Sequence, residues 1–111
     1  MLSIFKTKIP EEISVINVDE YKVAIQKPNV QLVDVRTKNE FLQGKINKAI
    51  NIDVLSPNFE TKIKNFNKSE PVYIYCRSGN RSRKAARIML GMGFKKIIDL
   101  EGGYIKWNKY N

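Results

Sequence analysis

Five short apolar runs rich in Val and Ile alternate along this chain with segments in which apolar residues recur at helical spacing. Short runs rich in β-branched residues are typical of buried strands, and these cover residues 13–17, 31–35, 49–52 (the weakest), 72–76 and 96–100. Strands that alternate with helices pair in parallel, because each helix returns the chain to the same end of the sheet. The sequence therefore predicts an α/β fold with a five-stranded, mostly parallel sheet flanked by helices.

Helical spacing and end signals predict helices over residues 19–26, 39–42, 57–65, 81–91 and 103–110. Asp19 is the expected N-cap of the first helix. In the fourth helix, Met89 and the following Met92 are expected to face the core. The chain has 111 residues and no repeat or low-complexity linker, so it is expected to form a single domain over residues 1–111.

Histidine is absent and cysteine occurs once, as Cys76. The absence of imidazole excludes Ser/His/Asp and Cys/His catalytic pairs and nearly every zinc site, and a lone thiol excludes an internal disulfide. No apolar stretch reaches the roughly 20 residues that a membrane span needs. Lysines also interrupt residues 1–10 before a secretion signal could form. The chain is therefore expected in the cytoplasm, away from membranes.

The formal net charge of +9 comes mainly from lysines scattered along the whole chain, which argues against a nucleic-acid-binding surface. Four of the five arginines, in contrast, cluster between residues 77 and 87, and the fifth is Arg36. No Asp or Glu occurs from Pro71 to Ile98. This region is expected to attract an anion.

Cys76 ends an apolar run, and a short loop of small and basic residues separates it from the fourth predicted helix. Ligands of open α/β sheets bind beyond the carboxyl ends of strands, and a helix N-terminus there favours negative charge. Gly79 allows backbone conformations that turn successive N–H groups inward. With Arg77 and Arg81 nearby, these features favour the thiolate of Cys76 without a general base. A buried structural thiol is the competing interpretation.

The loop Cys76-Arg-Ser-Gly-Asn-Arg-Ser82 resembles the active-site loop of rhodanese-type sulfurtransferases. Three further motifs, in the family's order, extend the resemblance over about residues 12–110: Leu32-Val-Asp-Val-Arg36 with Glu40-Phe41, Gly44-Lys-Ile-Asn-Lys-Ala-Ile-Asn-Ile52, and Leu100-Glu-Gly-Gly-Tyr-Ile-Lys-Trp107. The resemblance implies a five-stranded parallel sheet with helices on both faces. Lys45 departs from the family's pattern, since many relatives have His there, and we expect it to affect packing or partner choice more than sulfur chemistry.

The resemblance also implies a reaction. A sulfane sulfur would pass from a donor such as thiosulfate to Cys76 as a persulfide, and then to cyanide, a thiol or a protein. Cys76 would be the catalytic nucleophile, and the loop would bind the donor and the persulfide through Arg77, Ser78, Gly79, Asn80, Arg81 and Ser82. Arg77, with Arg81 as a second candidate, would attract the anionic donor. Neither a metal nor an organic cofactor is expected, and the protein is expected to be a monomer.

Three other functions remain open from the sequence. A persulfide carrier or regulatory interaction module would share the loop but use protein donors and acceptors. A Cys-dependent phosphatase or arsenate reductase is less favoured, because such loops carry Arg where this chain has Ser82 and need a carboxylic acid that the loop lacks. Nucleic-acid binding would instead predict salt-sensitive retention on DNA that is independent of Cys76.

Several residues outside the loop are expected to have structural roles. Asp34 and Arg36 lie at the end of the second strand, and Arg36 is expected to pair with Glu40 four positions later. Tyr104 and Trp107 are expected to pack beneath the loop. The exposed face formed by Arg83 and Arg87 is expected to be solvated, with docking of an acidic sulfur-carrier partner as the alternative.

Overall fold

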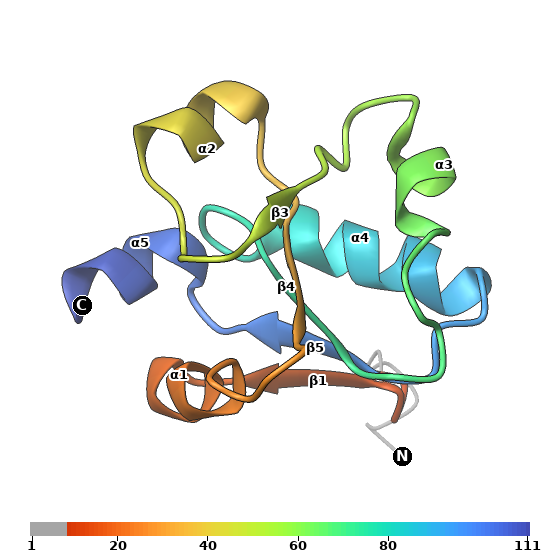
Figure 1. Ribbon diagram of the computed structural model, residues 1–111, viewed down its shortest axis with the longest axis horizontal. Helices are drawn as coiled ribbons and strands as arrows, with labels where there is room; N and C mark the ends of the chain where they lie inside the picture. Colours follow the sequence, from red (N-terminus) through yellow and green to blue (C-terminus); the bar gives the residue numbers. More distant parts are fainter. Residues whose placement is uncertain (1–8) are drawn as a thin grey trace, which may run out of the picture.

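The computed structural model describes residues 9–111. The expected absence of a secretion signal concerns residues 1–10, of which only residues 9 and 10 are described. Five strands alternate with five helices (Figure 1). The strands are β1 (Ile13–Ile16), β2 (Gln31–Asp34), β3 (Ile50–Asn51), β4 (Val72–Tyr75) and β5 (Ile97–Leu100). The helices are α1 (Val18–Ala24), α2 (Lys38–Gln43), α3 (Phe59–Ile63), α4 (Asn80–Gly91) and α5 (Gly103–Lys109).

The strands form one sheet in the order β1-β5-β4-β2-β3, and every pairing is parallel. The predicted five-stranded parallel sheet is therefore confirmed. The central strand β4 has β5 on one side and β2 on the other. A parallel strand in this position is buried on both faces, which accounts for the unbroken apolar run before Cys76.

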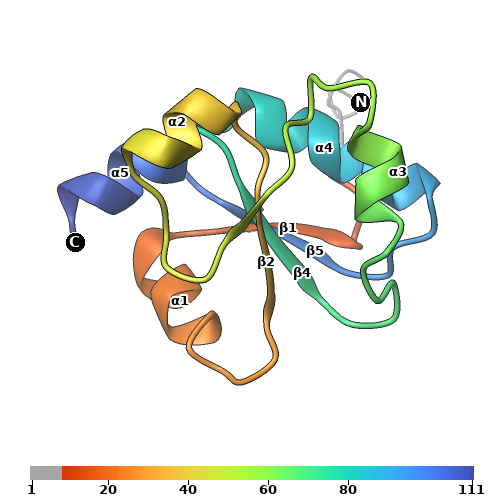
Figure 2. The same cartoon turned by 45° about the horizontal axis from the view of Figure 1, so that its top comes forward.

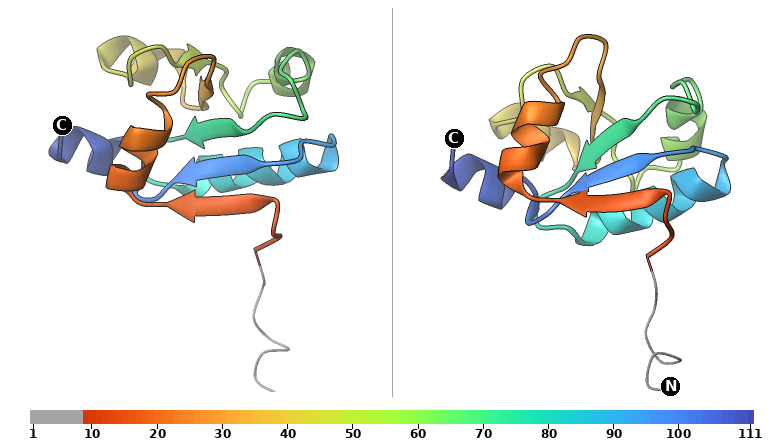
Figure 3. Two further views of the ribbon diagram at one scale, coloured as in Figure 1. Left: turned by 60° about the horizontal axis from the view of Figure 1, so that its bottom comes forward. Right: turned by 90° about the horizontal axis from the view of Figure 1, so that it is seen from below.

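Helices cover both faces of the sheet, as Figure 3 shows with α1 on the near side and α4 on the far side of the strands. Alternate residues of each strand face opposite clusters. On one face, Ile74 and Ile97 pack with Ala85 and Met89 of α4. On the other face, Tyr75, Ile98 and Leu100 pack with Tyr21 of α1 and with Tyr104 and Trp107 of α5. Met92 is only partly buried against the first cluster.

Several element boundaries differ from the sequence-based ones. The N-cap of α1 is Asn17, whose side chain accepts a hydrogen bond from the Glu20 N–H at 2.9 Å, so Asp19 lies inside the first turn. Its negative charge there suits the positive end of the helix. The third helix, α3, covers only residues 59–63 of the predicted 57–65, and a turn closed by a hydrogen bond from the Phe59 N–H to the Ser56 carbonyl precedes it.

Three helices lie at the carboxyl end of the sheet. Figure 2 shows α2, the start of α4 and α5 close together there. The segments that follow β2, β4 and β5 all leave the sheet at this end, because the strands are parallel. None of the helices in residues 9–111 is long and apolar enough to span a bilayer.

Candidate active site

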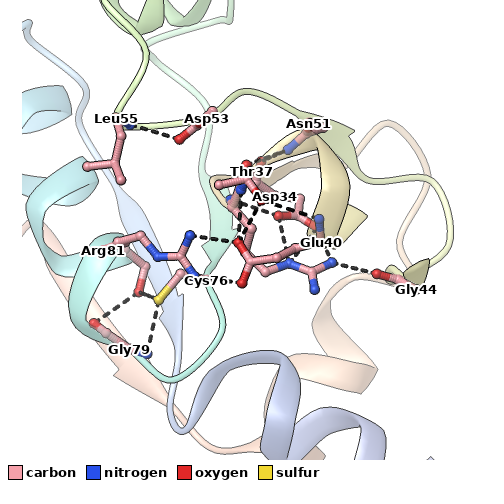
Figure 4. A network of polar contacts seen from close by, with 12 residues as sticks. Asp34, Thr37, Glu40, Gly44, Asn51, Asp53, Leu55, Cys76, Gly79 and Arg81 are labelled. Atoms are coloured by element: carbon pink, nitrogen blue, oxygen red, sulfur yellow. Dashed lines mark hydrogen bonds and ion pairs between the residues drawn. The ribbon is translucent and has the colours of Figure 1, made fainter. Parts of the chain in front are cut away.

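Cys76 directly follows β4, and its side chain is 1% exposed. The chain turns sharply after it and enters α4 through Gly79, whose φ of 119° lies in the region that favours glycine. This conformation brings the Gly79 N–H to 3.0 Å from the Cys76 sulfur (Figure 4). The loop thus folds back onto its own cysteine at the N-terminal end of a helix of 12 residues.

The hydroxyl of Ser82 is the second contact of the sulfur. The Cys76 Sγ lies 3.4 Å from Ser82 Oγ, and Ser82 Oγ donates a hydrogen bond to the Gly79 carbonyl at 3.2 Å. Ser82 is fully buried in the first turn of α4. One backbone N–H and one hydroxyl therefore face the sulfur, and the helix N-terminus behind them favours negative charge. This arrangement can hold a sulfur anion.

The back of the loop is fixed by the start of α5. The Tyr104 N–H donates to the Cys76 carbonyl at 2.8 Å, and the Ile105 N–H donates to the Arg77 carbonyl at 3.1 Å. This close approach requires glycine at Gly103, where φ is +60° and an added Cβ would lie 2.5 Å from the Arg77 carbonyl oxygen. The second glycine of the Gly-Gly motif therefore has a steric explanation.

Arg81 is held by a carboxylate from α2. Its guanidinium makes two hydrogen bonds to Glu40, at 2.7 and 2.9 Å (Figure 4). Glu40 also completes the capping box of α2 with Thr37. The bond from Arg81 lowers the pKa of Glu40 to about 2 and raises the pKa of Arg81. The predicted pair between Arg36 and Glu40 is wrong, because Glu40 points across the site to α4.

Arg36 instead pairs with Asp34, two residues earlier. Arg36 Nη2 lies 2.6 Å from Asp34 Oδ2 and donates to the Gly44 carbonyl, also at 2.6 Å. The guanidinium lies over the ring of Tyr104, 4.4 Å from its centroid, and Tyr104 stacks on Tyr75. Both charged side chains are almost fully buried. These contacts hold the chain after β2 against the start of α5. Because the charges of Arg36 and Asp34 are paired with each other, they leave little net charge to attract a substrate.

Arg77 has a different environment, because it is exposed and forms no ion pair with any described residue. It borders an open pocket of about 220 Å³ whose other walls include Glu40, Gly44, Tyr104 and Ile105. A larger hollow, of about 540 Å³, lies between α2 and the chain after β3 and touches none of residues 76–82. The pocket at Arg77 adjoins the cysteine loop.

The other residues singled out in the sequence lie at the surface of the loop, on α4, on α5 or after α2. Ser78 and Asn80 lie in the loop with exposed side chains. Arg83 and Arg87 are exposed on α4, and Trp107 packs against Tyr21 rather than beneath the loop. Lys45 is exposed, with its Nζ 5.0 Å from the centre of the Phe41 ring.

One buried group was missed by the sequence reasoning. Asp99 in β5 is 2% exposed, and burial raises its pKa to about 6. The available signal was a single carboxylate among the apolar residues 97–100. Within residues 9–111, no group of three or more His, Cys, Asp or Glu side chains is placed to hold a metal ion.

The fold and the cysteine loop define a class of protein, and comparison with known proteins agrees. The chain belongs to the rhodanese-like family, whose domain model matches residues 17–110. It is 30% identical to thiosulfate sulfurtransferase 18 of Arabidopsis thaliana, with 95% of this chain and 85% of the relative covered. It is 36% identical to a sulfurtransferase of Allochromatium vinosum, covering 74% and 75% of the two chains.

A solved structure agrees with this assignment. The crystal structure of a rhodanese-like domain protein from Staphylococcus aureus superposes with a TM-score of 0.75 at 34% identity, covering 85% of this chain and 90% of that one. The predicted family and its fold are thereby confirmed.

Proposed function

We propose that this protein is a sulfurtransferase that carries sulfane sulfur as a persulfide on Cys76. The observation that carries the proposal is the placement of the Cys76 sulfur, which accepts the Gly79 N–H at the N-terminal end of α4. A thiolate or persulfide anion in this position is stabilised by fixed dipoles. A nucleophile activated in this way needs no imidazole base, in agreement with a chain that has no histidine.

With thiosulfate as donor, the Cys76 thiolate attacks the outer sulfur. A new S–S bond forms, the bond between the outer sulfur and the sulfonate sulfur breaks, and sulfite leaves with the electron pair. An acceptor such as cyanide then attacks the terminal sulfur of the persulfide, forms thiocyanate and restores the thiolate. Both steps are displacements at sulfur, so the cycle is balanced without a redox cofactor.

The loop residues have separate tasks in this proposal. The N–H groups between Arg77 and Ser82 surround the persulfide, and the exposed guanidinium of Arg77 attracts the anionic donor. Arg81 is mainly a positioning residue, because Glu40 already occupies both of its terminal nitrogens. Its task is to tie the first turn of α4 to α2. The proposal includes a single domain that acts as a monomer in a reducing compartment such as the cytoplasm.

The test is intact-protein mass spectrometry after brief exposure to thiosulfate and then to cyanide. The expected result is a gain of one sulfur atom, its loss on addition of cyanide, and no adduct on the Cys76→Ser variant. The variant is the matched control, because serine keeps the size of the side chain and removes the nucleophile. An adduct of the same mass on the variant contradicts the proposal.

A second candidate is a persulfide carrier that receives sulfur from proteins and has little thiosulfate activity. The Glu40–Arg81 pair favours this alternative, since it leaves Arg77 as the one uncompensated arginine of the loop in the described structure. A carrier would show no saturation with thiosulfate but rapid transfer from a protein persulfide. A phosphatase is disfavoured, because Ser82 stands where such loops have Arg, and its hydroxyl is directed at the Gly79 carbonyl.

A further inference from the structure

The ion pair between Glu40 and Arg81 lies next to the reactive sulfur. Arg81 belongs to the first turn of α4 and directly precedes Ser82, whose Oγ lies 3.4 Å from the Cys76 sulfur. The Gly79 N–H, at 3.0 Å from the sulfur, belongs to the same turn of chain. Figure 4 shows the Arg81 guanidinium extending past Cys76 towards Glu40. The pair therefore lies where an anionic donor must approach.

Both terminal nitrogens of Arg81 are engaged by Glu40. They donate to the two carboxylate oxygens at 2.7 and 2.9 Å, which is the geometry of a bidentate, charge-assisted pair. Arg81 lowers the pKa of Glu40 to about 2, so the carboxylate is ionised throughout the neutral range. The two charges compensate each other. Arg81 consequently adds no net charge to the cysteine loop, although it is one of the loop's two arginines.

The pocket beside the loop has one uncompensated charge among the described residues. Three of its lining residues are charged, namely Arg36, Glu40 and Arg77. Arg36 is paired with Asp34, and Glu40 is paired as described. Arg77 forms no ion pair with any described residue. The remaining walls are uncharged and consist of Gln43, Gly44, Tyr104 and Ile105. A pocket with a net charge of +1 complements a singly charged anion better than thiosulfate, which carries two negative charges.

We propose that Glu40 determines which sulfur donors Cys76 accepts, because it neutralises Arg81 and leaves the pocket with one positive charge. Donors with a single negative charge, such as organic thiosulfonates, are favoured relative to thiosulfate. With a thiosulfonate, the Cys76 thiolate attacks the outer sulfur, the S–S bond of the donor breaks, and an organic sulfinate leaves with the electron pair. Glu40 acts through Arg81, so it is a positioning residue.

The proposal deepens the proposed function, but its first test requires only the thiol. Cys76 is alkylated with iodoacetamide, which is neutral, and with iodoacetate, which carries one negative charge. Both reagents are similar in size and react with the same thiolate with loss of iodide, so the ratio of their rates reports the charge near the sulfur. Intact-protein mass spectrometry measures both rates.

In Glu40→Gln, the ratio of the iodoacetate rate to the iodoacetamide rate is expected to rise about three- to tenfold at low ionic strength, because Arg81 loses its compensating charge. The rise is expected to shrink at about 0.5 M salt, which screens the charge. Glutamine suits this test because it can also complete the capping box of α2 with Thr37.

Two further variants separate charge from structure. Arg81→Gln leaves the Glu40 carboxylate uncompensated and is expected to lower the ratio by a similar factor. The double variant has no net charge at this position and is expected between the two single variants. A purely structural role would change the two alkylation rates alike in every variant, which would overturn the proposal.

Glu101→Gln is the matched control, because it removes one carboxylate just after β5 at the same end of the sheet. Glu101 is exposed, and its only ion pair in the described structure is with Lys106 at 3.5 Å. The control is expected to leave the ratio unchanged. An unchanged ratio in Glu40→Gln, or an equal rise in Glu101→Gln, overturns the proposal. If Arg81→Gln does not fold, the comparison of Glu40→Gln with Glu101→Gln decides.

Two sulfur donors extend the test to the proposed reaction. Glu40→Gln is expected to raise kcat/KM about threefold for the methanethiosulfonate anion and about tenfold for thiosulfate, because the electrostatic free energy scales with the charge of the donor. Equal changes for the two donors contradict the proposed donor preference.

The result is separable from that of the proposed function. A changed alkylation ratio together with no sulfur adduct from any donor would leave the role of Glu40 established and the sulfurtransferase proposal contradicted. An adduct together with an unchanged ratio would contradict only the role of Glu40.

Discussion

Gly103 shows how closely single residues determine the geometry around the Cys76 sulfur. Its φ of +60° and its contact with the Arg77 carbonyl allow α5 to hold the back of the loop. Any side chain there must displace backbone atoms, because no flexible group is available to move aside. The shape of the loop thus depends on a residue that carries no chemistry.

Gly103→Ala is expected to destabilise the protein by at least about 2 kcal/mol, through backbone strain and steric overlap. Urea denaturation measures the change. Gly91→Ala is the matched control, because a Cβ at Gly91 meets nothing within 4 Å and its backbone conformation is ordinary. The control is expected to be neutral or more stable by up to about 1 kcal/mol. Equal losses in the two variants would contradict the steric explanation.

Arg77→Ala is expected to raise the KM for thiosulfate about tenfold while leaving the lifetime of the Cys76 persulfide unchanged. The reason is that, in the proposed function, Arg77 at the open pocket would attract the donor, whereas backbone N–H groups would hold the persulfide. Steady-state kinetics and the decay of the mass adduct measure the two effects. Lys84→Ala removes an equally exposed charge from α4 and is expected to change neither.

The elements around the site are joined by a few contacts distant in sequence. The pair between Glu40 and Arg81 links α2 to α4, and the amides of α5 link it to the loop after β4. These contacts join parts of the chain that the sheet topology alone brings to one end. The site is therefore an assembly of helix termini rather than a property of one loop.

Glu40→Gln is expected to lower stability at neutral pH by about 1 kcal/mol, a small value because the pair is partly exposed to solvent. Its folded-state pKa of about 2 is below the ordinary value of 4.5, so the stabilisation is complete above pH 4.5. It is lost as the pH falls from 4.5 towards 2. Urea denaturation of both proteins across this range measures the difference, which would persist at pH 2 if the ion pair were not its source.

The sequence predicted the elements well and their connections poorly. Runs rich in Val and Ile identified all five strands, and the four motifs identified the loop, because these signals are local. The partner of Glu40 could not be found in this way. Spacing of four favoured Arg36, but the β2 backbone turns Arg36 towards Asp34, and the true partner, Arg81, is 41 residues away. The burial of Asp99 arises where α4 packs on β5, and its apolar neighbours in β5 were the local signal for it.

At the scale of the whole molecule, one buried carboxyl influences the stability of the fold. Asp99 has a folded-state pKa of about 6, raised by burial from an ordinary value of 3.8. The folded protein therefore holds this proton more tightly than the unfolded chain does. Folding stability falls as the pH rises from about 4 to about 6 and stays lower above that range.

Asp99→Asn is accordingly expected to be more stable than the wild type at pH 7 to 8, by about 2 to 3 kcal/mol. The advantage should shrink below pH 6 and vanish near pH 4, where the wild-type carboxyl is neutral in both states. Urea denaturation at several pH values measures the difference. An advantage that is the same at pH 4 and pH 8 would show that ionisation of Asp99 is not its cause.

The hydrogen bonds from the Tyr104 and Ile105 amides to the Cys76 and Arg77 carbonyls also set an order of events during synthesis. These amides lie almost 30 residues after the cysteine, so a growing chain exposes Cys76 long before the part that fixes its loop has been made. The loop around Cys76 can therefore take its fixed shape only after residues 104–105 have been made and α5 has docked. Under the proposed function, folding of α5 onto the loop would then be the step that activates the thiol.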